Sequence, residues 1–373
     1  MIKFKTVIFR IIEMPLVTPF ETSSARIDNK SLLLLEFIDH EGTRIFSECV
    51  AKQIPNYTPE TVDTALIVLK KHILPLILGH SFQHPSDLVE KIQSHVRGNL
   101  MAIASVDMAA WALHATHLGV SLSHAIGGVK PSIECGISLG IQSSPDALAQ
   151  LVQEEASAGY KKIKCKIKPG KDIAFIEKVR EVCGNEIPLM VDANNAYQLS
   201  DINDLKAMDE MGLVMMEQPL AWDDIAMHAQ LQPQLKTPVC LDESIFHAEH
   251  ARVAIELGAT KIINIKPGRV GGFTESLKIH DICEKNNIPV WCGGMLETGI
   301  GRAYNVALAS KSNFKIPGDT SPSRRYWSQD IVSPEWEMSS DGLMQVPTKP
   351  GLGVDIDHDR IESLCVHKEV MDA

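Results

Sequence analysis

The chain has 373 residues, of which 45% are hydrophobic and 22% charged, a composition typical of globular proteins and not of disordered ones. Its net charge of −11 argues against nucleic acid as a partner, because binding phosphates requires clustered Lys and Arg. No apolar run approaches the ~20 residues of a membrane span, so no membrane partner is expected. The eight cysteines form no CxxC pair, which predicts reduced thiols in a cytoplasmic protein.

The N-terminal part of the chain is predicted to be an α+β module covering 1–130. Residues 2–12 alternate in hydrophobicity as a strand does, and 31–51 have the pattern of a β-hairpin. The period then becomes helical, with Thr58 as the expected N-cap of the first helix and Pro59 at its first position. Strands followed by helices are typical of an α+β architecture.

From residue 131 onward, short apolar strands alternate with amphipathic helices in at least seven consecutive units. This alternation indicates a parallel sheet, and the lack of a long reversing connection favours a closed barrel over an open sheet. We predict that the barrel covers 131–325. The segment 326–373 loses the alternation and carries Pro and Gly, so it is expected to return to the N-terminal module.

Five ionisable residues stand near the C-terminal ends of five successive predicted strands: Lys166, Asp192, Glu217, Asp242 and Lys266. They are separated by 26, 25, 25 and 24 residues, and each step is about one strand–helix unit. Taken alone, an acid at a strand end is usually a turn residue or a helix cap. Five in register indicate a shared site, because active sites of βα barrels form at this rim.

The three acids of this series predict a metal site. Converging carboxylates repel one another unless a cation lies between them, and burying one unpaired costs several kcal/mol. Ligand sets made only of oxygen suit hard ions, with Mg²⁺ as the first choice and Mn²⁺ as the next. Asp192, Glu217 and Asp242 are therefore the predicted ligands.

The two lysines predict acid–base chemistry. Lys162, Lys164 and Lys166 alternate with apolar residues and share one strand face. This pattern also occurs on edge strands protected by Lys, but within the βα series that face would point into the barrel. Lys164 beside Lys166 disfavours protonation of either amine, which favours a base. With Lys266 on the opposite side, the pair suits proton abstraction next to a carboxylate of a small-molecule substrate.

Several segments resemble the barrel motifs of the enolase superfamily, most closely its o-succinylbenzoate synthase / N-acylamino acid racemase group: KIKCKIKPG, VDANNAY, MEQPL, LDES, NIKPGRVGG and GGMLETGIGRA. PFETSS (19–24) is similar to the specificity loop of that group's capping domain, and 317–332 and 350–357 resemble its late segments. The resemblance covers nearly the whole chain. It implies a modified TIM barrel, (β/α)7β, with an α+β capping domain, Mg²⁺ on the three acids, and Lys166 and Lys266 as the catalytic pair.

The resemblance leaves two main reactions open, and a muconate-type cycloisomerase or a dipeptide epimerase, which share the same core, is a minor option. One is the syn-dehydration of 2-succinyl-6-hydroxy-2,4-cyclohexadiene-1-carboxylate to o-succinylbenzoate in menaquinone synthesis, by a lyase. The other is racemisation of N-acyl, especially N-succinyl, amino acids, in which Arg269 could lower the pKa of Lys266. One protein could have both activities. A non-catalytic binding barrel predicts the loss of at least one of the five groups, and all are present. We expect a homo-oligomer.

Further candidates surround the five groups. Polar residues near the strand ends are expected to support the catalytic groups: Lys164, Asn194, Glu243 and Asn264. Apolar residues and a glycine turn are expected to bind the substrate, with backbone N–H groups of the turn holding a carboxylate: Phe20, Gly293, Gly294, Met295 and Leu296.

Overall fold

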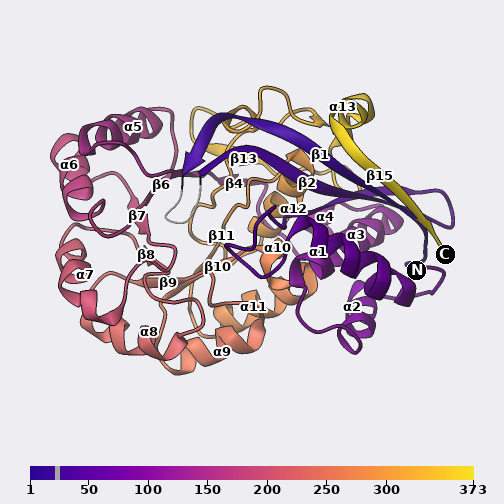
Figure 1. Cartoon of the computed structure of the whole chain (residues 1–373), viewed down its shortest axis with the longest axis horizontal. Helices are drawn as coiled ribbons and strands as arrows, with labels where there is room; N and C mark the ends of the chain where they lie inside the picture. The colour runs from indigo at the N-terminus through magenta and orange to yellow at the C-terminus, as the bar shows by residue number, and fades with distance from the viewer. Residues whose placement is uncertain (22–25) are drawn as a thin grey trace.

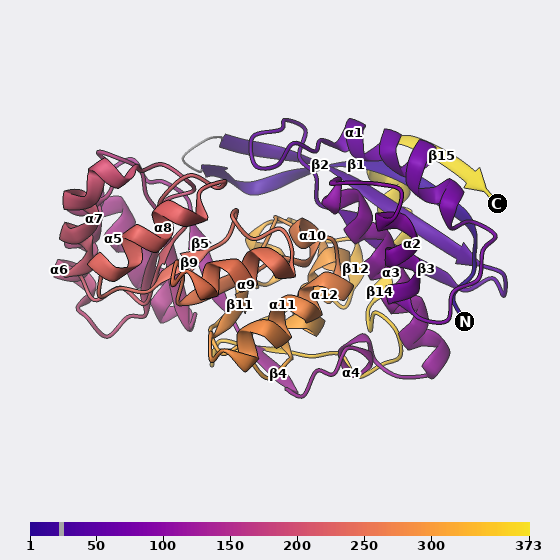
Figure 2. The same cartoon turned by 90° about the horizontal axis from the view of Figure 1, so that it is seen from below.

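The computed structural model describes residues 1–21 and 26–373 and shows a cap beside a barrel (Figures 1 and 2). Residues 22–25 fall outside the described residues. The segment predicted to be a specificity loop, 19–24, therefore lies partly outside them, and only its first three residues can be placed.

A four-stranded antiparallel sheet forms one layer of the cap, in the order β15–β1–β2–β3. Its strands are β1 (Phe4–Glu21), β2 (Arg26–Asp39), β3 (Arg44–Cys49) and β15 (Cys365–Asp372). Gly42 adopts a φ of 87° between β2 and β3, so the predicted hairpin is confirmed. Thr6 pairs with Asp372, which brings the two ends of the described chain into one sheet, and in Figures 1 and 2 the paired strands β1 and β2 extend toward the barrel.

The helices of the cap are α1 (Val62–Val68), α2 (Pro85–Gln93), α3 (Leu100–Leu118) and α4 (Leu122–Ala125). The prediction that Thr58 caps the first helix is wrong. Thr61 is the N-cap, because its Oγ1 accepts a hydrogen bond from Thr64 N while Thr64 Oγ1 accepts one from Thr61 N. Glu60 instead accepts hydrogen bonds from two backbone N–H groups in the first turn of α3.

Helix α3 joins the cap to the barrel. It is buried over most of its length because β3 and α2 pack on it from the cap, and α10 and α11 from the barrel. Asp107 of α3 accepts hydrogen bonds from the backbone N–H and the hydroxyl of Thr274. Trp111 donates to the same hydroxyl at 3.1 Å, so this tryptophan is part of the core.

The barrel consists of parallel strands in sequence order, as predicted. They are β5 (Gly136–Leu139), β6 (Lys162–Lys166), β7 (Leu189–Asp192), β8 (Met216–Glu217), β9 (Val239–Leu241), β10 (Ile262–Ile265) and β11 (Val290–Cys292). Residues 318–319 close the ring between the first and the last of them. Gly318 O accepts a hydrogen bond from Gly136 N, and Asp319 N donates to Cys292 O at 3.0 Å. This short segment is the final β unit of a (β/α)7β barrel.

The barrel helices alternate with the strands and lie around the outside of the sheet (Figure 1). They are α5 (Pro145–Ser157), α6 (Ile173–Cys183), α7 (Ile202–Asp209), α8 (Ile225–Leu231), α9 (Ala248–Glu256), α10 (Pro267–Val270), α11 (Phe273–Lys285) and α12 (Gly299–Ala309). Ser144 caps α5, because its side chain accepts a hydrogen bond from Ala147 N. The outer helices leave the C-terminal strand ends facing the cap.

The remaining elements are short. They are β4 (Ser132–Glu134), β12 (Val332–Ser333), β13 (Leu343–Gln345), β14 (Asp355–Ile356) and α13 (His358–Leu364), with a π-helical turn at Leu69–Ile73 and 3₁₀ turns at Leu74–Leu76, Leu199–Asp201, Gln232–Gln234 and Ser323–Arg325. Within 1–21 and 26–373, every helix is too short or too polar to cross a membrane. The domain boundaries at residues 130 and 325 stay a prediction.

Candidate active site

Three carboxylates converge at the C-terminal end of the barrel. Asp192 and Glu217 are the last residues of β7 and β8 and pair with each other in register, and Asp242 directly follows β9. All three side chains are fully buried, and the carboxyl groups of Asp192 and Glu217 are in contact. Burial together with the charge of Asp192 raises the pKa of Glu217. The site therefore concentrates negative charge out of contact with water.

The lysines of β6 form layers inside the barrel, so the strand is not a lysine-protected edge. Lys162 is deepest, with its Nζ 3.5 Å from the ring centre of Trp291. Lys164 lies above it and forms ion pairs with Asp319 at 2.7 Å and Glu217 at 3.1 Å, and these acids hold its pKa well above the usual value against the effect of burial. It is therefore a cation of the site and not a neutral amine.

Lys166 occupies the top layer of β6, at the mouth of the barrel. It pairs in register with Asp192, and its Nζ donates to Asp192 Oδ2 and to Asn194 Oδ1, each at 2.6 Å. Burial lowers the pKa of Lys166, and the positive charge of Lys164 acts in the same direction. A lowered pKa is the property that a proton-abstracting amine requires.

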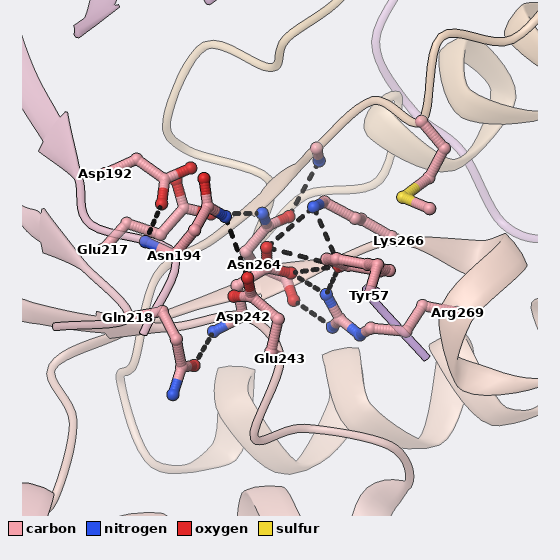
Figure 3. A network of polar contacts seen from close by, with 12 residues as sticks. Tyr57, Asp192, Asn194, Glu217, Gln218, Asp242, Glu243, Asn264, Lys266 and Arg269 are labelled. Carbon is pink, nitrogen blue, oxygen red and sulfur yellow. Dashed lines mark hydrogen bonds and ion pairs between the residues drawn. The ribbon is translucent and has the colours of Figure 1, made fainter. Parts of the chain in front are cut away.

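Lys266 directly follows β10, on the side of the barrel opposite β6. Its Nζ donates to Asp242 Oδ2 at 2.7 Å and to the hydroxyl of Tyr57 at 3.0 Å (Figure 3). Burial favours the neutral amine, but Tyr57, Glu217 and Glu243 outweigh it and raise the pKa of Lys266. Lys266 is thus held as a cation while Lys166 tends toward the neutral form.

Arg269 lies beneath this side of the site and is fully buried. Its Nη1 pairs with Asp242, its Nη2 donates to the carbonyl of Asn264 at 2.7 Å, and its Nε donates to the carbonyl of Ile245 at 3.0 Å. The suggestion that Arg269 lowers the pKa of Lys266 is not met in this structure, because the pKa of Lys266 is raised. Arg269 and Lys266 each form an ion pair with Asp242, one with each carboxylate oxygen.

The predicted supporting residues connect the carboxylates to one another (Figure 3). Asn194 N donates to Asp192 Oδ1 at 3.0 Å, and Asn194 Nδ2 donates to Glu243 Oε1 at 2.8 Å. Asn264 Nδ2 donates to Glu217 Oε1 at 2.7 Å. Lys164 pairs with Asp192, Glu217 and Asp319, and not with Glu243.

The glycine turn after β11 lies beside the cleft, but two of its N–H groups are already used. Gly293 N donates to Asn264 Oδ1 at 2.8 Å, and Met295 N donates to Glu297 Oε2 at 2.8 Å. These two N–H groups thus have partners within the protein, and the binding of a substrate carboxylate by the turn stays a prediction. Lys30 of β2 donates to the carbonyls of Met295 and Leu296, which ties the turn to the cap.

A cleft of about 700 Å³ lies between the cap and the barrel mouth. Both lysines of the predicted pair open into it, and so do Phe20, Gly294, Met295 and Leu296 among the predicted substrate residues. Gly293 is not part of its lining. The cap supplies most of the remaining wall, through 26–31 of β2 and the loop 52–59. The strand spacing in the sequence predicts the residues at the barrel mouth but few of the cap residues that complete the cleft.

The residues present fit a hard divalent cation. Asp192, Glu217 and Asp242 offer buried oxygen atoms only, and Glu243 Oε2 beside them has no hydrogen-bond partner among the described residues. Burial raises the pKa of Glu243, and the charge of Asp192 acts in the same direction, so a cation beside these two acids would relieve their repulsion.

Two groups of side chains in the described residues bring potential ligand atoms within 4.8 Å of one another, and both lie outside the barrel site: Asp39 with Glu41 and His117, and His280 with Asp281 and Glu284. The predicted trio is not one of these groups, since Asp242 turns its oxygens to Lys266, Arg269 and Tyr57. Both other groups contain two exposed members, whereas the barrel acids are fully buried.

Sequence reasoning missed Tyr57 and Asp319. Tyr57 comes from a loop of the cap and contacts both Lys266 and Asp242. Asp319 closes the barrel and forms the shortest ion pair of Lys164. The weak signal for Asp319 was its place in the segment 317–332, which resembles a late family segment without forming an apolar strand.

Two family models match this chain. The one described as Enolase C-terminal domain-like covers residues 147–360, which is more than half of the chain. The one described as Mandelate racemase / muconate lactonizing enzyme, N-terminal domain covers 5–127. The chain belongs to the enolase superfamily. The predicted fold, a modified TIM barrel with an N-terminal cap, is thereby confirmed.

Named relatives in the superfamily place the chain more closely. It is 47% identical to an o-succinylbenzoate synthase of Geobacillus kaustophilus over 97% of this chain and 96% of the relative. It is 44% identical to an N-succinylamino acid racemase of Thermus thermophilus over 98% of each chain. A solved structure of an enolase-superfamily member from Listeria innocua superposes with a TM-score of 0.95 at 39% identity and covers 99% of both chains. The group predicted within the superfamily is confirmed, and the protein is an enzyme.

Proposed function

We propose that this enzyme dehydrates 2-succinyl-6-hydroxy-2,4-cyclohexadiene-1-carboxylate to o-succinylbenzoate, and that racemisation of N-succinylamino acids is the alternative activity of the same site. The observation that carries the proposal is the pair Lys166 and Lys266, which open from opposite sides of the barrel into one cleft. The relatives named for these two reactions, at 47% and 44% identity over nearly the full length, support the substrate class.

Lys166 is the proposed base of the dehydration. Its neutral amine, favoured by burial, takes the proton from the carbon next to the substrate carboxylate. The C–H bond breaks, the ring C–O bond breaks, and a ring double bond forms as the hydroxyl departs. Lys166 then gives the proton to the departing oxygen, so water leaves and the amine is regenerated. One residue can serve both steps because a syn elimination uses a single face.

Lys266 is proposed to remain protonated during dehydration. Tyr57 and the acids around it stabilise the ammonium form, which attracts negative charge as the proton leaves the substrate. Racemisation requires more, because each lysine must act as a base for one enantiomer. The two reactions therefore make different demands on this amine.

Asp192, Glu217 and Asp242 are the residues proposed to hold a divalent cation, Mg²⁺ first and Mn²⁺ next. When bound, such an ion supplies electrostatic stabilisation of the negative charge that gathers on the substrate carboxylate. Asn194, Asn264 and Lys164 keep Asp192 and Glu217 in place through the hydrogen bonds and ion pairs described above. Arg269 and Lys266 pair with Asp242.

Replacing Lys266 by arginine should separate the two activities. Arginine keeps the positive charge but does not deprotonate, so we expect dehydration to fall by about tenfold or less and racemisation by at least about a hundredfold. Dehydration is followed through formation of o-succinylbenzoate, and racemisation through polarimetry of an N-succinylamino acid. Equal losses of the two activities would contradict this division of roles.

Two assays on the unmodified enzyme decide between the reactions. Formation of o-succinylbenzoate from the cyclohexadiene measures the lyase. Incorporation of solvent deuterium at the α-carbon of both enantiomers of an N-succinylamino acid measures the racemase. An enzyme that performs neither reaction would refute the proposed function.

A cytoplasmic location and a homo-oligomeric state also belong to the proposal.

A further inference from the structure

Three cations from the cap line the cleft: Arg26, Lys30 and Lys52. Two of them are already engaged. The buried ammonium of Lys30 donates to the carbonyls of Met295 and Leu296, and Arg26 forms an ion pair with Asp28 at 3.2 Å on the exposed rim. The charge of Lys30 is thus used to hold two backbone carbonyls, and the charge of Arg26 is paired and exposed to solvent.

Lys52 differs from these two. Within the described residues it forms no ion pair, and its polar contact is a long hydrogen bond of 3.3 Å to Asn56 Oδ1. Its Nζ lies 5.2 Å from the ring centre of Tyr57, the same ring that has the Nζ of Lys266 at 4.9 Å. Lys52 therefore brings a positive charge that has no ion-pair partner among the described residues close to the reacting end of the cleft.

The surroundings of Lys52 favour an anion at this point. Burial, together with the charges of Lys166, Lys266 and Lys30, lowers the pKa of Lys52 to about 8, although the charge of Glu243 acts in the opposite direction. The side chain still carries its charge at neutral pH, but in a region where cations repel it. A carboxylate beside Lys52 would relieve that repulsion while remaining partly shielded from water.

The two candidate substrates share the feature that such a position would recognise. In the cyclohexadiene, a succinyl group ends in a carboxylate that is separated by a fixed number of bonds from the carbon that loses its proton. An N-succinylamino acid places its terminal carboxylate the same number of bonds from its α-carbon. One cation at a fixed distance from the lysine pair can therefore serve both reactions.

We propose that the ammonium of Lys52 binds the terminal carboxylate of the substrate's succinyl group and so selects succinyl over uncharged acyl substrates. This inference rests on the proposed function and names the residue that recognises the far end of the substrate. It also involves the loop 52–59, which carries both Lys52 and Tyr57. Val62 N donates to Lys52 O at 2.9 Å, so the first residue of this loop is fixed by a backbone hydrogen bond. A carboxylate bound at Lys52 would therefore keep the loop over the part of the cleft that contains Lys266.

The test compares Lys52→Gln with Lys52→Arg, using racemisation of one amino acid as its N-succinyl and its N-acetyl derivative. Losing one charge-assisted hydrogen bond should lower the ratio of kcat/KM values, succinyl over acetyl, by about 10- to 100-fold in Lys52→Gln. The loss should appear mainly in KM, since the reacting groups are unchanged. Lys52→Arg should restore most of the ratio because it keeps the cation.

Arg26→Gln is the matched control, since Arg26 is the other cap cation without a buried role. The ratio of kcat/KM values, succinyl over acetyl, should stay within about twofold of that of the unmodified enzyme, because an exposed ion pair contributes little to binding. A ratio that is unchanged in Lys52→Gln, or one that falls in Arg26→Gln instead, would overturn the assignment.

A binding measurement separates this inference from the proposed function. Calorimetric titration with o-succinylbenzoate should show a weaker Kd for Lys52→Gln than for the unmodified enzyme, by a similar factor and whether or not turnover occurs. If neither reaction is catalysed but this difference is found, the proposed function fails and the subsite stands. If the unmodified enzyme turns over but binds no more tightly than Lys52→Gln, the subsite fails alone.

Discussion

Replacing Lys166 by alanine is expected to lower kcat for dehydration by about 10²- to 10⁴-fold, the usual contribution of a positioned general base. The amine is removed from the mouth of the barrel, where it pairs with Asp192 and Asn194. The three proposed ligands keep their places on β7, β8 and after β9, so titration with Mg²⁺ should still show binding. The measurement is therefore a pair: kcat from product formation and Kd from metal titration.

Lys168→Ala serves as the control for this prediction. Lys168 follows Lys166 by two residues but does not line the cleft. We expect its kcat to stay within about twofold of the unmodified enzyme, the range of a substitution away from a functional group. Full dehydration activity in Lys166→Ala would remove this residue as the base, and a parallel loss of metal binding would mean that the variant disturbs the acids instead.

The register of the barrel explains why the lysine and two acids could be found from the sequence. Parallel strands of a barrel advance by one βα unit at a time, so residues separated by about 25 positions come to the same level. The structure pairs Lys166 with Asp192 and Asp192 with Glu217 in this way. Residues that are evenly spaced along the chain therefore lie side by side at the C-terminal end of the barrel.

The rest of the site depends on contacts that no spacing encodes. Tyr57 reaches Lys266 from a loop of the cap, more than two hundred residues earlier in the chain, and its place follows from how the cap packs on the barrel. Asp319 lies on a closing strand formed by two hydrogen-bonded residues, too short to produce an apolar pattern. Lys52 was missed for the same reason as Tyr57.

Local hydrogen bonds also explain why two features, the N-cap of α1 and the direction of the Arg269 side chain, differ from what the sequence pattern predicts. Thr58 and Thr61 both precede an apolar run, but a second hydroxyl three residues along, at Thr64, completes the cap at Thr61. Arg269 follows Lys266 closely enough to suggest an effect on its amine. Its guanidinium instead turns to Asp242 and to two backbone carbonyls, a direction that depends on the packing under the barrel mouth.

Replacing Glu217 by glutamine should abolish the stabilisation that Mg²⁺ gives the enzyme. A ligand that binds only the folded state at 100 times its Kd raises the free energy of unfolding by about 2.7 kcal/mol. Glu217 contacts Asp192 and Asn264 at the centre of the proposed ligand set. The neutral amide of Glu217→Gln should therefore raise the Kd for Mg²⁺ so far that the same Mg²⁺ concentration no longer saturates the site. The substitution relieves the repulsion between Glu217 and Asp192 but also removes the buried ion pair of Glu217 with Lys164, so the prediction concerns only the difference in stability with and without Mg²⁺ in the same variant.

Thermal unfolding with and without Mg²⁺ measures this effect independently of activity, and kcat should fall by at least about a hundredfold in the same variant. Glu41→Gln and Glu284→Gln are the matched controls, since they alter the two other groups of potential ligands in the described residues. Both controls should keep the full Mg²⁺-dependent rise in unfolding temperature. If Glu217→Gln keeps that rise and Glu41→Gln loses it, the cation binds at the cap and not between the acids of the barrel, and the electrostatic basis proposed for proton abstraction by Lys166 falls with it.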